Sequence, residues 1–182
     1  MRHLAGRGLV AQIALIVALQ TPVSAALAQD HLRELIVVAF DQDRVAVAVE
    51  DVREIQRAAM PAHLPNAPQI VEGVLNLRGE LVPLLDVRGR LGYGARALRA
   101  TDHIVIATAS GRAIAFAVDE VLELTEVAQA DIQEAVSLVA GTAHIAGVAT
   151  LPDGVLVIHD LGTLLAVDEV FGIARALAAA AS

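Results

Sequence analysis

The feature that most constrains this fold is an internal repeat that spans residues 45–160. The apolar segment 45–55 recurs 69 positions further on, at 114–124. A second segment, from Gly73 to Asp86, recurs 74 positions further on, from Gly147 to Asp160. Self-similarity of this kind indicates two copies of one small structural unit. Neither copy is large enough to bury a stable core alone, so we expect the two units to share one.

Short apolar runs separated by polar or glycine-containing breaks indicate that both units are mainly β. Alternation or continuous apolar character over four to six residues is typical of half-buried or buried strands. Regular spacing of such strands predicts a small barrel or sandwich. The expected strands are 35–40, 45–49, 81–85, 104–107, 114–118 and 155–158.

Helical segments are expected to be few. A short turn of helix is predicted for Val52 to Ala59, before Pro61. The segment 86–91 begins with Asp86, and the segment 161–165 follows Asp160. Each can begin a helix with a carboxylate at its N-terminus. The alanine-rich tail, 171–181, has high helix propensity.

Composition excludes several classes of protein. The 182 residues are 56% apolar and 19% charged, which is not the composition of a disordered chain. A net charge of −8 argues against nucleic acid as a partner, because phosphate binding needs a clustered positive surface. The absence of cysteine excludes disulfides, thiolate nucleophiles and cysteine-based zinc sites.

No catalytic or cofactor-binding pattern is visible in the sequence. The six histidines include no pair with helical i, i+4 spacing, although His144 and His159 could approach across strands. There is no Gly-x-Ser-x-Gly segment and no glycine-rich phosphate loop. The neighbouring carboxylates Glu50-Asp51 and Asp119-Glu120 are interpreted as solvated turn residues, since adjacent side chains point apart on a strand. We therefore expect no enzyme, no metal and no cofactor.

The first 29 residues read as a signal-like or non-native extension. Arg2 and Arg7 precede an apolar stretch from Leu9 to Leu19, and residues 26–28, Ala-Leu-Ala, fit a cleavage site. An upstream start codon that adds a non-native segment is the alternative. A true signal peptide would mean export, whereas its absence fits a cytoplasmic protein.

The segment from Leu64 to Arg88 strongly resembles the CheW family signature. It contains Pro-Asn-Ala-Pro at 65–68, then Gly-Val-Leu-Asn-Leu-Arg-Gly at 73–79, then Pro-Leu-Leu-Asp-Val-Arg at 83–88. Val118-Asp119-Glu120-Val121 and Gly147-Val148-Ala149 are supporting matches, and the resemblance extends over 34–167. Only Val87 departs from the signature, and conservatively.

The resemblance implies two intertwined SH3-like five-stranded barrels around one shared core, with short helices and a C-terminal helix. It implies an adaptor without catalytic activity, and no insertion of the folded domain into a membrane. Its implied partners are the regulatory domain of a CheA-type histidine kinase and the cytoplasmic tip of chemoreceptors. Its implied location is the cytoplasm, at membrane-associated receptor arrays. Arg78, Asn76, Gly79, Val52, Glu54 and Ile55 are the residues that it assigns to partner binding.

Alternatives remain at several of these positions. Arg78 could form a structural salt bridge, and Val52 and Ile55 could be plain core residues. The expected organisation is an extension at 1–29 and a CheW-like domain at 30–182, with β subdomains at roughly 40–100 and 101–165 and a helix at 166–182. The main rival function is an exported β-domain that binds a ligand or a protein, and a small enzyme is the third hypothesis.

Overall fold

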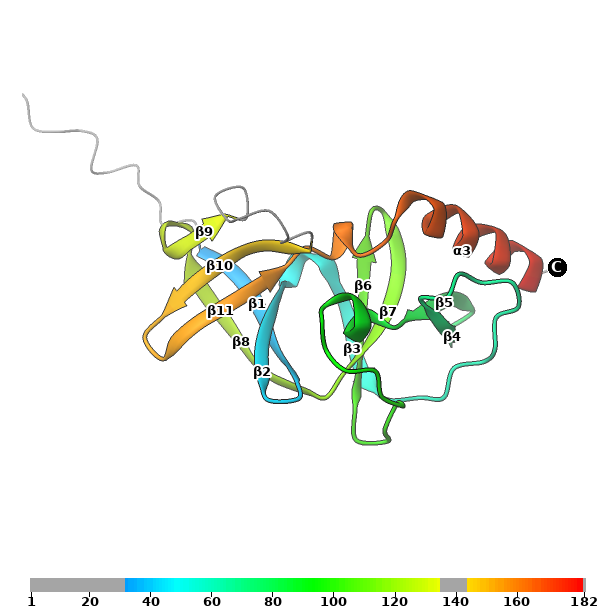
Figure 1. Ribbon diagram of the computed structural model, residues 1–182, viewed down its shortest axis with the longest axis horizontal. Coiled ribbons are helices and arrows are strands. Elements are labelled where there is room, and N and C mark those ends of the chain that lie inside the picture. Colours follow the sequence, from blue (N-terminus) through cyan, green and yellow to red (C-terminus); the bar gives the residue numbers. More distant parts are fainter. Residues whose placement is uncertain (1–31, 135–143, 182) are drawn as a thin grey trace, which may run out of the picture. The chain divides into compact units, whose positions relative to one another are not determined.

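The computed structural model describes residues 32–134 and 144–181, and these form two β-sheets and a C-terminal helix (Figure 1). The signal-like segment lies outside the described residues. The described residues belong to one compact unit.

The first sheet, here called barrel 1, has six strands. In spatial order they are β8 (Glu120–Ala128), β1 (Leu32–Phe40), β2 (Asp43–Ala48), β11 (Gly154–His159), β10 (Ile145–Leu151) and β9 (Ile132–Glu134). All neighbouring pairs are antiparallel except β2 and β11, which are parallel.

The second sheet, here called barrel 2, has five strands. In spatial order they are β3 (Val52–Arg57), β6 (His103–Ala109), β7 (Arg112–Val118), β5 (Glu80–Leu85) and β4 (Val71–Leu77). The pair β5 and β7 is parallel, and the other pairs are antiparallel.

The helices are short except for the last. The α-helices are α2 (Val87–Arg90) and α3 (Val167–Ala180), and the 3-10 turns are η2 (Val49–Asp51), η3 (Gln129–Asp131) and η5 (Leu161–Thr163). Asp86 accepts a hydrogen bond from the Gly89 amide, and Asp160 accepts one from the Gly162 amide. The two aspartates therefore cap α2 and η5, as the sequence predicts.

The two barrels exchange strands. After the hairpin β1–β2 the chain passes through η2 into barrel 2 as β3, and after the hairpin β6–β7 it passes at Asp119 into barrel 1 as β8. Each barrel thus contains strands from both halves of the sequence. The expected subdomain limits, 40–100 and 101–165, do not follow the sheets, because each crossover carries a strand into the other barrel.

The internal repeat is present in the strand register. The parallel pair Leu84–Ala115 in barrel 2 corresponds to the pair Ile158–Ala46 in barrel 1 under the same offsets that relate the sequence copies. The bulge between Val71 and Gly73 corresponds to the bulge between Ile145 and Gly147. The two copies therefore fold in the same way, related by the exchange of strands.

A shared core lies between the barrels, and each barrel also has a core of its own. Val38 and Phe40 of β1 pack in one cluster with Val105 of β6 and Phe116 of β7. The alternate residues of the same strands face inward: Leu35 and Val37 into barrel 1, Ile104 and Ile106 into barrel 2. Burial of both faces explains why these strands are continuous apolar runs in the sequence.

One secondary-structure prediction is wrong. The segment Val52–Ala59 contains no helix; Val52–Arg57 is the strand β3, at the edge of barrel 2. A bulge between Val52 and Glu54 inserts one residue into the strand. The apolar residues Val52 and Ile55 are therefore three positions apart, a spacing that imitates a helix.

Candidate partner-binding site

Arg78 and Gly79 form the tight turn between β4 and β5. Leu77 pairs with Glu80 across this two-residue turn, and both turn residues have positive φ, 54° for Arg78 and 94° for Gly79. This is the conformation of a type I′ hairpin turn, in which glycine or asparagine is usual at both positions. Arg78 therefore occupies a left-handed backbone conformation that disfavours residues with a β-carbon.

The side chain of Arg78 is 88% exposed and ends beside β3. Its Nη2 lies 3.1 Å from Glu54 Oε2. A second pair, Arg53 with Glu80, is joined by two hydrogen bonds of 3.0 and 2.9 Å. These ion pairs connect β3 to the tip of the β4–β5 hairpin, although β3 and β4 are at opposite edges of the sheet order.

Asn76 and Gly79 support the turn rather than extend from it. The Asn76 Oδ1 atom accepts a hydrogen bond of 2.8 Å from the Gly79 amide. This contact fixes the turn and so fixes the position from which Arg78 projects. The structure thus brings Arg78, Glu54, Asn76 and Gly79 together, as four of the six predicted residues.

Val52 and Ile55 extend the same region along β3. Both are half-buried and pack against the shared core, so the core interpretation holds for part of each side chain. Their remaining surface flanks Glu54 on the same strand. Whether partners contact these residues stays a prediction.

Two exposed leucines were missed by the sequence analysis. Leu122 and Leu124 of β8 are 41% and 63% exposed. Leu124 is the counterpart of Ile55 under the 69-residue repeat, and β8 is the counterpart of β3. The internal repeat could have predicted this site, because it makes Leu124 equivalent to Ile55, which was predicted to bind partners.

Asp119 is not the solvated turn residue that the sequence predicts, whereas its neighbour Glu120 is exposed as predicted. The Asp119 side chain is 20% exposed and pairs with Arg88 at 3.0 Å and closely with Arg96. It also accepts a hydrogen bond of 2.7 Å from the Asp41 amide. Asp119 is thus a structural residue at the strand crossover, because Arg88 of α2 and Arg96 of the loop that follows both pair with it.

Arg88 and Arg96 connect Asp119 to two further aspartates, Asp41 and Asp102, in an ionic network. These five residues are here called the crossover cluster. Arg88 is buried, pairs with Asp41 at 2.6 Å, and lies 5.6 Å from the centre of the Phe40 ring. Arg96 binds Asp102 with two hydrogen bonds of 2.8 and 3.0 Å. Burial would raise the pKa of Asp119, but the hydrogen bond from Arg96 and the neighbouring positive charges outweigh burial and lower that pKa. The pKa of Asp102 is lowered in the same way.

His144 and His159 are neighbours, as the sequence suggested, but they are joined through the backbone. His159 Nδ1 lies 2.9 Å from the carbonyl oxygen of His144. Burial lowers the pKa of His159. Within residues 32–134 and 144–181, no group of three histidine or carboxylate side chains could hold a metal ion. No helix in that part of the chain is long and apolar enough to cross a bilayer.

Comparison with known proteins identifies the family. The model of the CheW-like domain family matches residues 34–169, which include all but the first two strand residues of the two barrels and the whole candidate site. The chain belongs to the CheW-like domain family.

The relatives include chemotaxis proteins. The chemotaxis protein CheW of Rhizobium meliloti (strain 1021) is 35% identical over 101 residues, 56% of this chain and 65% of that protein. The probable chemotaxis protein CheW of Rhizobium etli is 31% identical over a match with the same coverage. The chain thus spans about 65% of the length of these two relatives.

A solved structure has the same fold. The scaffolding protein TtCheW from Thermoanaerobacter tengcongensis superposes with a TM-score of 0.68 at 25% identity, covering 76% of this chain and 95% of that one. The predicted fold class, mainly β with two SH3-like barrels, short helices and a C-terminal helix, is confirmed. One barrel has six strands rather than five, because the three-residue β9 adds to its edge.

Proposed function

We propose that this chain is a non-catalytic adaptor that couples chemoreceptors to a CheA-type histidine kinase. In this role it is cytoplasmic and is recruited to receptor arrays at the membrane. It uses two protein interfaces: one for the regulatory domain of the kinase, and one for the cytoplasmic tip of the receptor. Membership in the CheW-like domain family and the names of the chemotaxis relatives support this proposal.

The observation that carries the proposal is the conformation of Arg78. An arginine with φ of 54° costs the folded state roughly 1 kcal/mol relative to glycine. Its one ion pair, with Glu54, is exposed, and exposed pairs contribute only about 0–1 kcal/mol. Fold stability therefore gives little reason for arginine here. An exposed guanidinium on a rigid turn is well placed to bind a carboxylate of a partner.

Arg78, Glu54, Asn76 and Gly79 form the centre of the proposed interface, with Val52 and Ile55 as its apolar continuation along β3. Asn76 and Gly79 act by fixing the turn, and Arg78 by direct contact. Leu122 and Leu124 are a second apolar contact region by the internal repeat.

The test is to measure binding of the kinase regulatory domain and of a receptor-tip fragment to wild type and to Arg78→Glu. Reversing the charge at an interface places like charges together and can cost several kcal/mol, so binding to at least one partner should fall at least tenfold. Arg78→Lys should fall between wild type and Arg78→Glu, because lysine lacks the planar fork.

Arg99→Glu is the matched control, since Arg99 is an exposed arginine on the loop before β6. It makes the same change of charge away from the β4–β5 turn and should leave binding within about twofold. Unchanged binding of Arg78→Glu to both partners would remove Arg78 from the interface.

A further inference from the structure

The internal repeat produces two equivalent clefts, one in each barrel. In barrel 1 the parallel strands β2 and β11 pair only at Val45–Val157 and Ala46–Ile158. In barrel 2 the parallel strands β5 and β7 likewise pair at only two positions. In both barrels the N-terminal ends of the two strands are unpaired with each other, and a cleft opens between them.

The cleft in barrel 2 is covered by the helix α3. Val170, Ile173 and Leu177, spaced along one face of α3, line this cleft together with Leu81 of β5 and Ile114 of β7. Arg90 of α2 holds the start of α3 in place. It donates a hydrogen bond of 2.9 Å to the Leu164 carbonyl and forms an ion pair with Glu169. An amphipathic helix thus completes barrel 2.

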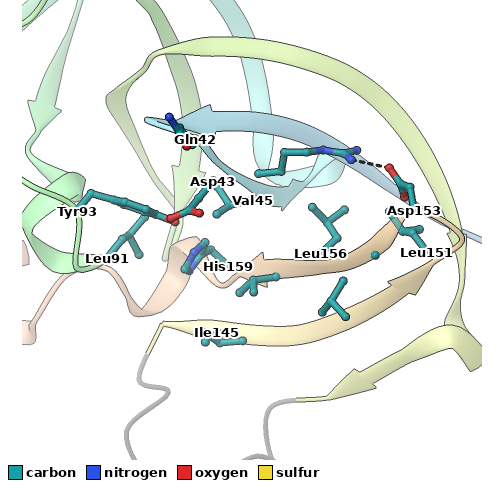
Figure 2. Close-up of a pocket in the computed structure, with 14 residues that line it drawn as sticks. Gln42, Asp43, Val45, Leu91, Tyr93, Ile145, Leu151, Asp153, Leu156 and His159 are labelled. Carbon is teal, nitrogen blue, oxygen red and sulfur yellow. Dashed lines mark hydrogen bonds and ion pairs between the residues drawn. The ribbon is translucent and has the colours of Figure 1, made fainter.

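The equivalent cleft in barrel 1 has a volume of about 530 Å³, and no helix of the described chain covers it. Figure 2 shows Val45 and Leu156 on the two strands, with Tyr93 and Leu91 at one end of the cleft and Leu151 and Asp153 at the other. After α2 the chain forms the Leu91–Tyr93 segment and no helix follows, whereas α3 follows η5.

One pair of equivalent residues, Val155 and Leu81, differs in exposure because only the cleft of barrel 2 is covered by a helix. Val155 is the counterpart of Leu81 under the 74-residue repeat. Leu81 is half-buried and packs near Leu177 of α3. Val155, at the same position of barrel 1, is 68% exposed. The cleft of barrel 1 therefore has an apolar wall without the helix that covers its twin.

The charge at the mouth of the cleft is reversed between the barrels. Asp43 stands in barrel 1 where Arg112 stands in barrel 2. Asp153 is neutralised by Arg44 at 2.6 Å, but within the described residues the carboxylate of Asp43 has no hydrogen bond or ion pair. A segment that covers this cleft would be favoured by a positive charge beside Asp43.

We propose that the cleft of barrel 1 binds an amphipathic helix of a partner protein. The helix has aliphatic side chains spaced as Val170, Ile173 and Leu177 are in α3, and a lysine or arginine next to Asp43. This inference goes beyond the coupling function, because it rests on the repeat and on the cleft and not on the Arg78 region.

Tyr93 is a built-in probe for this binding. It lines the cleft, it is the one tyrosine of the chain, and the chain has no tryptophan. Its fluorescence therefore reports on this cleft. The test ligand is a synthetic peptide with the sequence of residues 165–180 in which Asp168 and Glu169 are both replaced by lysine. The peptide contains neither tyrosine nor tryptophan.

Titration of the full chain with this peptide should give a saturable change in Tyr93 fluorescence. Val155→Lys should weaken the binding about tenfold or more, because it replaces an apolar contact with a like charge. Asp43→Asn should weaken it less. Met60→Lys is the matched control, since Met60 is 86% exposed and outside the cleft, and it should leave binding within about twofold.

Two results would overturn the proposal. One is the absence of saturable binding to wild type, and the other is equal weakening by Met60→Lys and Val155→Lys. The peptide with the unmodified sequence of residues 165–180 tests whether the cleft binds an acidic helix instead of a basic one. If it binds more tightly than the lysine peptide, the cleft accepts the acidic helix α3 of a second copy of this chain, which contradicts the proposed basic partner.

Discussion

At the scale of single residues, we expect the Arg78 side chain to matter for partner binding and not for the stability of the fold. Its backbone conformation favours glycine, and its ion pair with Glu54 is exposed. A residue retained for stability should be asparagine or glycine at this position. The proposed interface supplies the reason for arginine.

Arg78→Gly should therefore leave the free energy of unfolding unchanged or raise it by about 1 kcal/mol, since relief of strain offsets the lost ion pair. Binding to the kinase or receptor fragment should weaken at least tenfold. Urea denaturation and binding titrations of the same variant give both quantities. Gly79→Ala is the contrasting variant, because its φ of 94° should make alanine destabilising. A loss of more than 2 kcal/mol in Arg78→Gly would favour a structural salt bridge instead.

For Asp119 we expect the opposite, namely that substitution lowers the stability of the fold, because its role is structural. Its pKa is lowered in the folded state, so its ionised form stabilises the fold above the ordinary aspartate pKa of about 3.9. That contribution is lost as pH falls below about 4 and through the lowered pKa. Asp119→Asn should reduce stability by about 1–3 kcal/mol at pH 7 and flatten the decline of Tm between about pH 4 and pH 2.

Glu120→Gln is the control for this measurement, since Glu120 is the exposed neighbour. It should change Tm little at pH 7 and leave the acid limb as it is in wild type. Equal effects of the two variants would mean that the crossover cluster does not stabilise the fold.

At the scale of elements, the two bulge glycines should be equivalent. A β-carbon on Gly73 would lie 2.6 Å from the Ala62 carbonyl oxygen, and one on Gly147 would lie 2.8 Å from the Gln133 carbonyl oxygen. In each barrel another segment of backbone thus lies close beside the bulged strand, and both neighbours are antiparallel to it.

Gly73→Ala and Gly147→Ala should each lower the free energy of unfolding by about 1–3 kcal/mol, because backbone must move to admit the methyl group. Gly94→Ala should have little effect, since nothing lies within 4 Å of its position. Denaturant midpoints compare the three. A neutral result at one bulge and a large loss at the other would show that the repeat does not extend to packing.

The elements also show what the sequence can and cannot predict. The strands with two buried faces, such as Leu35–Phe40 and Ile114–Val118, were predicted because both faces require apolar residues. The strand β3 was missed because its bulge replaces a two-residue apolar spacing with three. The burial of Asp119 was missed because Arg88 and Arg96, which pair with it, lie in segments distant along the chain.

At the scale of the whole molecule, the exchange of strands makes the two halves interdependent. The repeat and the shared core could be predicted from the residues alone, and the intertwining of the barrels was predicted through the family resemblance. The places where the chain crosses, at η2 and at Asp119, could not be predicted, because they depend on contacts between segments distant along the chain. Residues 101–160 contain β8 without its neighbour β1, and β11 without its neighbour β2.

A fragment of residues 101–160 should consequently be unfolded or aggregated, because both barrels would lack strands and the shared core would be open. The measurement is an NMR spectrum of the fragment beside that of residues 30–182. A dispersed spectrum from the fragment would contradict the shared core.

In the proposed coupling function, one molecule binds a receptor and a kinase at the same time. The direct measurement is co-sedimentation of the kinase regulatory domain with receptor-bearing membranes, with and without this protein. Wild type should carry the kinase domain into the pellet in proportion to the receptor, Arg99→Glu should do the same, and Arg78→Glu should reduce the amount at least tenfold. An unchanged pellet on addition of the wild-type protein, at concentrations where it is folded, would contradict the coupling function.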